Sequence, residues 1–286
     1  MTKIRISAFA DEAGNSINEQ ISALKTNGIF SVELRSIDKK NVADFSLKES
    51  KEYFNKFSDE GISVWAIGSP LGKVDVGVYV DEYIEKVKKV CEIANVFETD
   101  KIRMFSFFNA YNQKNKVVDY LSKMVEVGKT FGVKMCHENE KEVYGDTAER
   151  VLDLKKSVKG LNFIYDPANF IQVGETADKT LELFHADSIY FHIKDVIKET
   201  DELVPAGCGD GKINKLVSMI DRDTTLTLEP HLATFDSFKT IDNSVMKHKY
   251  EFKSNQEAFS FASNALKNIL NENGFKEKQG FFVKGE

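Results

Sequence analysis

Strand-like runs alternate with helix-like segments along the whole of this 286-residue chain. Eight short runs are rich in β-branched and aromatic residues, the composition typical of strands. They lie at residues 3–9, 31–35, 62–67, 101–107, 133–138, 161–166, 188–193 and 224–229. The segments between them carry apolar residues three and four positions apart, which is the period of a helix with one buried face. This alternation predicts parallel strands covered by helices, and eight such units predict a single closed (β/α)8 TIM barrel.

Signals for helix ends agree with this division. Residues 46–49 (SLKE) and 254–257 (SNQE) have the S-x-x-E form of a capping box, which begins a helix. Further helices are expected to begin near Ser16, Asp81 and Asp146. Four glycines follow the apolar stripes and are expected to end helices: Gly28, Gly61, Gly132 and Gly274.

An open, doubly wound sheet is the rival arrangement for alternating strands and helices. It would normally carry a G-x-G-x-x-G turn after its first strand, and residues 7–14 (SAFADEAG) do not have that form. The composition shows no break, so residues 1–286 are interpreted as one domain. The charged segment 275–286 (FKEKQGFFVKGE) is expected to be a loosely held C-terminal tail, apart from its Phe pair at 281–282.

Composition and charge argue against several classes of protein. A hydrophobic fraction of 42% and a charged fraction of 29% are typical of a soluble globular protein. The net charge of −6 argues against a nucleic-acid groove, and no run approaches the roughly 18 apolar residues of a membrane span. The three cysteines have no C-x-x-C spacing, and the N-terminus lacks the apolar core of a signal peptide. We therefore expect a cytoplasmic protein with reduced thiols and with no membrane or nucleic-acid partner.

Each of the last four predicted strands ends in a polar residue. These residues are Glu138, Asp166, His192 and Glu229. Strand C-termini converge on one face of a (β/α)8 barrel, and this face carries the active site in such enzymes. Three carboxylates and one imidazole gathered there are a ligand set for a divalent metal ion. The alternative is that four unrelated polar residues lie where strands give way to loops.

The alternation of side chains along the strands supports the metal-site interpretation. In the run 224–229, both leucines point to the side opposite Glu229. The other three runs have the same phase, so their apolar side chains can face the helices while the four polar residues share the barrel interior. His137 points away from Glu138 and is expected to be a packed or supporting histidine.

The segments around these four residues resemble a known family. From residue 134 onward the chain reads KMCHENEKEVYGDTAER, FIYDPANF, FHIKD, VPAGCGDGKI and LEPHL, in that order. Two further matching segments precede them, VELRSIDKKNV at 32–42 and AIGSPLGK at 66–73. This order resembles the xylose isomerase-like TIM barrels, specifically the sugar phosphate isomerase/epimerase group. The likeness covers nearly the whole chain, and its most specific parts are HENE, DPANF, HIKD and LEPH.

The resemblance implies a metal centre at the four strand ends. In that family the residues at the positions of Glu138, Asp166, His192 and Glu229 bind one divalent ion, which is manganese, cobalt, magnesium or zinc. Three oxygen ligands and one nitrogen ligand favour Mn²⁺ or Mg²⁺ by hardness, and the imidazole also admits Co²⁺ or Zn²⁺. In the family's epimerases the two glutamates are also the catalytic acid/base pair, which here implies Glu138 and Glu229.

The activity implied is isomerisation or epimerisation of a small sugar, sugar phosphate or keto acid. A metal ion on the carbonyl and adjacent hydroxyl oxygens stabilises the enediolate, while one carboxylate removes a proton and the other returns it. Two alternatives stay open: a dehydratase similar to the inosose dehydratases, which expels hydroxide, and a non-catalytic binding barrel. An abasic-site endonuclease of the same superfamily would need a histidine-rich zinc cluster, which five histidines and an acidic net charge do not favour.

Other residues near the predicted barrel mouth are candidates for binding a carbohydrate substrate. They are Arg35, Glu33, Lys194, Asn169 and His231. Arg35 could hold a carboxylate or phosphate through two hydrogen bonds, and a salt bridge at the barrel mouth is the alternative. Family epimerases often have histidine at the position of Asn169, which argues against a free ketohexose as substrate. A homo-oligomer is compatible with the sequence.

Three glycines lie close together in the segment 205–211 (PAGCGDG). Gly207, Gly209 and Gly211 could cradle a phosphate group of the substrate through their backbone N–H groups. The same glycines could instead make the segment a flexible lid, and the sequence does not decide between these roles.

Overall fold

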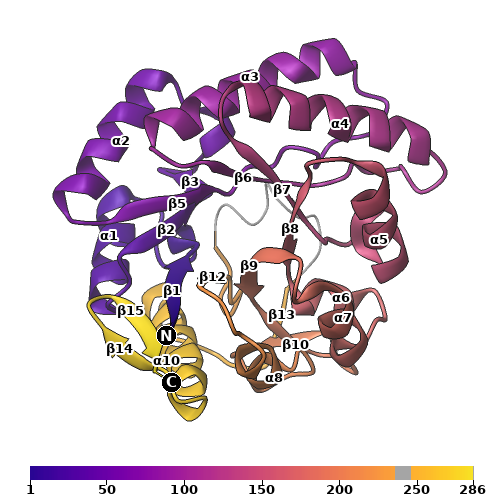
Figure 1. Ribbon diagram of the computed structural model, residues 1–286. Helices are drawn as coiled ribbons and strands as arrows, with labels where there is room; N and C mark the ends of the chain where they lie inside the picture. Colours follow the sequence, from indigo (N-terminus) through magenta and orange to yellow (C-terminus); the bar gives the residue numbers. More distant parts are fainter. Residues whose placement is uncertain (236–245, 286) are drawn as a thin grey trace.

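The computed structural model describes residues 1–235 and 246–285, and its central feature is a closed ring of eight parallel strands (Figure 1). The ring strands are β1 (Thr2–Ala8), β2 (Ser31–Leu34), β5 (Ser63–Ile67), β6 (Lys101–Met104), β7 (Lys134–Glu138), β8 (Asn162–Tyr165), β9 (Ser188–Ile193) and β12 (Thr224–Leu228). Each ring strand pairs with the next one in chain order, and β12 pairs with β1 to close the ring. The predicted (β/α)8 barrel and its eight strands are therefore confirmed.

Helices cover the outside of the ring, as Figure 1 shows. They are α1 (Ile17–Thr26), α2 (Leu47–Asp59), α3 (Val80–Val96), α4 (Lys114–Thr130), α5 (Ala148–Ser157), α6 (Pro167–Gln172), α7 (Ala177–Phe184), α8 (Ile213–Ser218) and α10 (Asn255–Glu272). Short 3-10 helices lie in three of the connections that follow ring strands, namely η1 (Ala10–Glu12), η2 (Val42–Asp44) and η3 (Tyr144–Asp146). The capping box predicted at residues 46–49 forms in full, and the Ser254 hydroxyl caps α10.

The helices differ from the sequence prediction in two places. The connection after β8 holds two helices, because Pro167 begins α6 directly behind Asp166, whose carboxylate caps it. The cap of α5 is Thr147, and Asp146 instead binds the side chain of Arg150. The first difference matters more for function, because α6 fixes the backbone around Asp166.

Shorter strands extend the ring at both ends. At the carboxyl end, β3 (Ser36–Ile37) pairs with β4 (Lys40–Asn41) after β2. Also at this end, β10 (Asp195–Ile197), β11 (Glu202–Val204) and β13 (Lys247–His248) form a small sheet that follows β9. At the amino end, β14 (Lys276–Lys278) and β15 (Phe281–Lys284) form a hairpin.

Apolar side chains pack on both faces of the ring strands. Met135 and Phe163 belong to the large core between the strands and the helices. A smaller cluster fills the inside of the ring and consists of Ala66, Cys136, Ile164 and Tyr190. Met135 and Cys136 are neighbours in the sequence but lie on opposite faces, so the predicted phase of this strand is confirmed.

The expectation of a loose C-terminal tail is wrong for residues 275–285, because more of the segment than its Phe pair is held on the barrel. The start of β1 projects past β2, which pairs with β1 only at Ala8, and so leaves backbone hydrogen-bonding groups open at residues 2–5. β15 pairs antiparallel with these residues, Thr2 opposite Lys284. Phe275 and Phe282 are buried in the large core, and together with the pairing they hold the hairpin on the barrel.

Replacing Phe282 with alanine is expected to lower the free energy of unfolding by about 3–5 kcal/mol, the usual cost of removing a buried phenyl group. Phe282 is 3% exposed, whereas Tyr79, on the loop before α3, is 79% exposed. The control Tyr79→Ala should change stability by no more than about 0.5 kcal/mol. Urea denaturation of the three proteins is the measurement, and equal midpoints would show that the hairpin adds nothing to stability.

None of the helices in the described part of the chain is long and apolar enough to cross a membrane. The three cysteines form no disulfide in the structure: Cys91 and Cys136 are buried and Cys208 is exposed.

Candidate metal centre

The four predicted metal ligands come together at the carboxyl end of the ring. Glu138 ends β7, Asp166 follows β8, His192 lies next to the last residue of β9, and Glu229 follows β12. All four side chains are buried. One candidate ligand atom from each residue lies within 4.8 Å of the other three, a spacing that one metal ion can bridge. The strand ends thus gather residues that lie far apart in the sequence.

His192 is held between carboxylates on both sides of its ring. Its Nδ1 lies 3.0 Å from Oε1 of Glu138 and 3.0 Å from Oε2 of Glu229. Its Nε2 lies 3.1 Å from Oε2 of Glu33, whose Oε1 accepts a hydrogen bond from the Tyr190 hydroxyl. A carboxylate behind a histidine ligand commonly fixes the tautomer and orientation of the ring. Glu33, predicted to bind substrate, is thus fully buried behind His192 and supports it.

Negative charge exceeds positive charge in and around this cluster. Seven buried carboxylates lie there: Asp11, Glu12, Glu33, Glu138, Glu140, Asp166 and Glu229. Four buried basic side chains lie among them: Arg35, Lys73, Arg103 and Lys194. Burial alone lowers the pKa of His192, but the neighbouring carboxylates, Glu138 foremost, outweigh it and raise this pKa well above its usual value. The same negative potential favours a bound cation.

The donor atoms themselves also suit a divalent ion. Oε2 of Glu138, Oδ2 of Asp166 and Oε2 of Glu229 accept no hydrogen bond from a described residue, although each lies near a nitrogen atom. Buried carboxylate oxygens normally accept hydrogen bonds or coordinate metal ions. Three such oxygens together with Nδ1 of His192 match the ligand preferences of Mn²⁺, Mg²⁺, Co²⁺ and Zn²⁺.

Lys194 and Asn169 join the cluster to α6. The ammonium group of Lys194 lies 3.0 Å from Oδ2 of Asp166 and donates a hydrogen bond to Oδ1 of Asn169 at 2.8 Å. The Asn169 amide donates to Oε1 of Glu138 at 3.3 Å. Burial lowers the pKa of Lys194, but Asp166 and other carboxylates outweigh it and raise the pKa above its usual value. Both predicted substrate-binding residues therefore touch predicted metal ligands.

Arg35 and His231 lie on the far side of Glu229. Arg35 donates to both carboxylate oxygens of Asp11 at 2.9 Å and to Oε1 of Glu229 at 3.0 Å. This is the salt-bridge alternative for Arg35, and contact with a substrate would require these ion pairs to open. Nε2 of His231 lies 3.5 Å from Oε1 of Glu229, and the His231 backbone N–H donates to Glu12. Asp11 and Glu12, which the sequence analysis did not single out, thus belong to this region.

The sequence analysis also did not single out a second buried arginine, Arg103 in β6. Its Nη1 lies 3.3 Å from Oε2 of Glu138 and 3.7 Å from Oε1 of Glu229, so it touches both predicted acid/base residues. Its Nη2 donates to the Gly68 carbonyl at 3.2 Å. The sequence held one signal that could have identified Arg103. It lies between two apolar residues of a predicted strand, and because strand side chains alternate between faces, the arginine points into the barrel.

His137 is the packed histidine that its phase indicates. Its Nε2 lies 3.0 Å from the Ser106 hydroxyl, and its ring packs so closely against Gly145 that a Cβ atom there would lie 2.5 Å away. Burial lowers the pKa of His137 to about 3, so the ring is neutral. It supports the loop after β7 and takes no part in the cluster.

The three glycines of segment 205–211 surround a carboxylate of the chain itself. The backbone N–H groups of Gly207 and Gly209 donate to Oδ2 of Asp195, and that of Gly211 donates to Oδ1, at 2.8–3.0 Å. A Cβ atom at Gly209 would lie 2.4 Å from this carboxylate, which explains why position 209 holds a residue without a side chain. The phosphate-cradle interpretation is therefore wrong, because Asp195 already binds these N–H groups.

Replacing Asp195 with alanine is expected to lower the free energy of unfolding by at least about 2 kcal/mol, because several backbone N–H groups lose their acceptor. Asp221, whose side chain is 84% exposed, provides the control Asp221→Ala, which should be nearly neutral. Thermal and urea unfolding of both variants would check this. If the two variants unfold alike, the Asp195 hydrogen bonds do not stabilise the segment.

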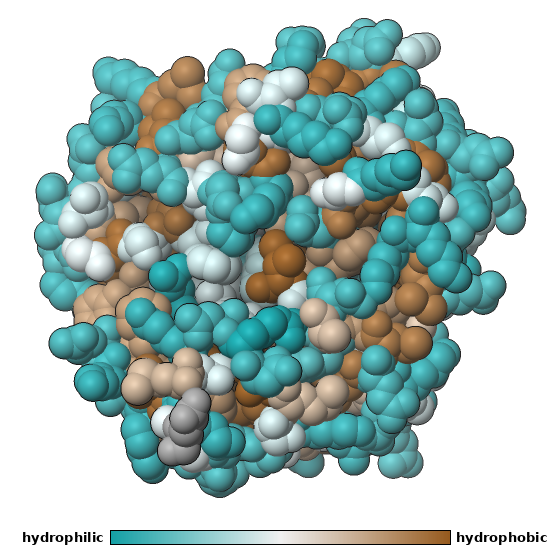
Figure 2. All heavy atoms as spheres, in the orientation of Figure 1, coloured by the Kyte–Doolittle hydropathy of each residue, from teal (hydrophilic) through white to brown (hydrophobic). Residues whose placement is uncertain are grey.

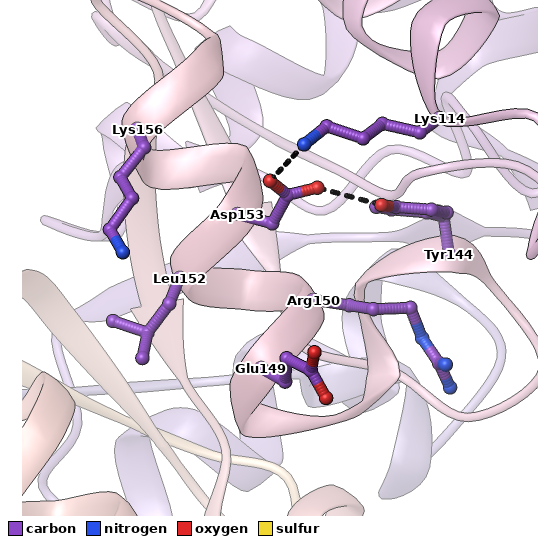
Figure 3. A pocket seen from close by; sticks show the side chains of 7 residues that line it. All are labelled: Lys114, Tyr144, Glu149, Arg150, Leu152, Asp153 and Lys156. Atoms are coloured by element: carbon purple, nitrogen blue, oxygen red, sulfur yellow. Dashed lines mark hydrogen bonds and ion pairs between the residues drawn. The ribbon is translucent and has the colours of Figure 1, made fainter.

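A pocket of about 440 Å³ lies outside the ring, between α4 and α5 (Figure 3). Asp153 points into it and accepts hydrogen bonds from Lys114 and Tyr144. None of the predicted metal ligands lines this pocket. It is therefore not a rival location for the candidate centre.

A comparison with protein families agrees with the fold. The sequence profile of the xylose isomerase-like TIM barrel family matches residues 21–243. This match covers most of the chain, and the chain belongs to that family. No curated protein matches the chain significantly.

Solved structures with the same fold are distant in sequence. The probable 3-DHS dehydratase AsbF from Bacillus anthracis has a TM-score of 0.70 and 16% identity, with 94% of this chain and 99% of that chain covered. An IolI protein with a bound zinc atom has a TM-score of 0.70 and 14% identity, with 95% and 99% covered. An L-ribulose 3-epimerase has a TM-score of 0.68 and 16% identity, with 95% and 97% covered. At these identities the likeness shows the fold alone.

Proposed function

We propose that this protein is a divalent-metal-dependent isomerase or epimerase of a small sugar, sugar phosphate or keto acid. The observation that carries the proposal is the buried cluster of Glu138, Asp166, His192 and Glu229, where an excess of carboxylates favours a cation. A divalent ion held by these residues would polarise a substrate carbonyl and acidify the neighbouring C–H group. Mn²⁺ or Mg²⁺ suits the three oxygen ligands best, and the imidazole admits Co²⁺ or Zn²⁺.

Two of the ligands have the chemistry and the placement of an acid/base pair. Glu138 and Glu229 come from β7 and β12, which are separated in the ring by β8 and β9. Their carboxylates therefore approach a central substrate from different directions, so that one can remove a proton and the other return one. Arg103 touches both side chains and holds them in place.

The remaining polar residues of the mouth are proposed to bind the substrate. Lys194, Asn169 and His231 lie beside the ligands and carry donors suited to hydroxyl or carbonyl oxygens. Arg35 and Glu33 are proposed to act indirectly, through Glu229 and His192. A neutral or anionic small carbohydrate is compatible with this set of groups.

Dehydration is the second candidate reaction. The fold is shared with a probable dehydratase as well as with an epimerase. Both reactions begin with removal of a proton beside a carbonyl, so the same glutamates would serve either one. They differ in the second step, since a lyase expels hydroxide where an isomerase reprotonates carbon.

The test is a panel of ketoses, aldoses, their phosphates and keto acids, incubated in D₂O with the metal-loaded protein and followed by NMR. Deuterium uptake without elimination supports the isomerase or epimerase, and elimination supports the dehydratase. Metal analysis of the purified protein is run in parallel. A protein that binds no stoichiometric metal and exchanges no substrate proton would be a non-catalytic binding barrel.

A further inference from the structure

The amino end of the ring holds a separate cavity of about 250 Å³, where β1, β9 and β12 begin. Trp65 and Ile189 line it from the ring, and Phe281 lines it from the C-terminal hairpin. Seen along the barrel axis in Figure 2, hydrophilic residues cover most of the visible face, and pale and hydrophobic residues gather around its centre. Lys3, Arg5 and Asp223 add charged groups to the lining of the cavity. A cavity lined by both aromatic and charged groups suits an amphipathic small molecule.

This cavity is distinct from the candidate metal centre. The ring of Trp65 packs edge-on against Tyr190, with 6.1 Å between centroids. The Tyr190 hydroxyl in turn donates to Glu33, which lies behind His192. The buried Tyr190 ring, whose centroid lies 5.6 Å from that of His192, thus stands between the cavity and the nearest predicted metal ligand, so a molecule bound in the cavity would not reach the metal.

Arg5 is a cation of this cavity that forms no ion pair with any carboxylate of the described residues. Its side chain is partly buried, and among the described residues no hydrogen bond or ion pair reaches its guanidinium group. The guanidinium carbon lies 4.7 Å from the centre of the Trp65 ring and 5.4 Å from that of Phe281. Stacking on aromatic rings uses the flat face of a guanidinium, whereas its N–H donors point outward in its plane. Those donors are therefore available to a ligand.

The surrounding charges favour an anionic ligand. Lys3 contributes a second cation, whose Nζ lies 3.6 Å from the centre of the Phe281 ring. Within the lining that the structure describes, Asp223 is the one carboxylate, and it accepts a hydrogen bond from the Lys3 backbone. A partly buried cation without a counter-ion is costly, so an anion that binds Arg5 through two oxygens would recover part of that cost.

We propose that this cavity is a binding site for a small organic anion. Arg5 and Lys3 hold its carboxylate or phosphate group, and Trp65 and Phe281 contact a flat apolar body. The cavity has room for about one aromatic ring with its acidic group, and it lies away from the chemistry proposed for the opposite end. The proposal does not depend on the metal centre or on the reaction.

Trp65 makes the proposal directly testable, because it is the only tryptophan of the chain. Its fluorescence is titrated with phenyl phosphate and with benzoate at constant ionic strength. Benzyl alcohol serves as the neutral analogue, inorganic phosphate as the anion without an apolar body, and sodium chloride as the salt control. The expected result is a saturable change with phenyl phosphate or benzoate, at least about tenfold tighter than with benzyl alcohol or phosphate. Whichever of the two anions binds more tightly shows whether the site prefers phosphate or carboxylate.

Variants locate the site and separate binding from folding. Arg5→Gln should weaken binding of the aromatic anion at least about tenfold, and Arg5→Lys should weaken it less, because charge is kept but the planar fork is lost. Lys3→Gln changes an exposed side chain and should weaken binding several-fold in a fully folded protein. The control Lys48→Gln removes an exposed charge on α2, outside the cavity lining, and should change nothing.

Three kinds of titration result would overturn the anion site. They are a linear response, a response matched by sodium chloride, and an equal response to benzyl alcohol. If Arg5→Gln does not fold, Arg5→Lys and Lys3→Gln decide the matter. Unchanged affinity in both folded variants would show that Arg5 and Lys3 only cover the amino end of the ring and do not bind the anion.

Discussion

The double variant Asp166→Ala, His192→Ala is expected to lose its divalent metal, falling from about one ion per chain to less than about a tenth. Both residues offer a buried donor atom within 4.8 Å of the other two candidate ligands. Removing one carboxylate and the imidazole leaves two ligands, which is too few to hold a divalent ion against water. Elemental analysis after dialysis against trace metal is the measurement.

Two further variants keep this test independent of folding. Asp166→Asn retains an oxygen that can cap α6 and removes only the charge, so it should keep the fold and bind the metal more weakly. The double variant Asp44→Ala, Asp221→Ala removes two exposed carboxylates and should bind metal as the wild type does. Wild-type metal content in the Asp166→Ala, His192→Ala protein would exclude this set of ligands.

Glu138→Gln and Glu229→Gln are each expected to lower kcat by about 10²–10⁴, the usual range for loss of a general acid or base. Each amide keeps the shape of the side chain and one oxygen ligand but removes the basicity. The comparison is made at saturating metal, on the substrate that the D₂O panel identifies, so that weaker metal binding does not enter. Circular dichroism verifies that both variants fold.

The two glutamates are expected to differ in a way that a structural role would not produce. Because each carboxylate would serve one face or one carbon of the substrate, one variant should still exchange the substrate proton with D₂O while failing to turn over. Glu126→Gln, an exposed change on α4, is the matched control and should be fully active. Activity within about tenfold of wild type in both metal-loaded variants would place the bases elsewhere.

Much of the fold was predictable because it depends on local periods. Runs with alternating side chains predicted each ring strand to within a few residues, and the phase of Met135 against Cys136 followed from the same period of two. The positions of Glu138 and Asp166 at strand ends followed as well, because parallel strands in a closed ring must end on one face. No contact had to be known for these inferences.

Charge compensation was not predictable in the same way. Arg35 and Glu229 are 194 positions apart and touch only because β12 pairs with β1 and so brings the last ring strand beside the first elements of the chain. Arg103 lies near Glu138 because β6 pairs with β7, and near Glu229 because the ring closes, and nothing local to KIRMF indicates two glutamates near it. Glu12 lies in a short helix without any pattern.

The C-terminal hairpin and the glycine segment show the same division. The sequence by itself determined the eight strands, their inward faces and the four polar strand ends, since these depend on side-chain periods along a few residues. Tertiary structure decided that Asp195 accepts hydrogen bonds from the glycine N–H groups and that β15 pairs with the open edge of β1. The physical reason is that a hydrogen-bonding group takes whichever partner the closed ring brings to it, and that partner can lie anywhere in the chain.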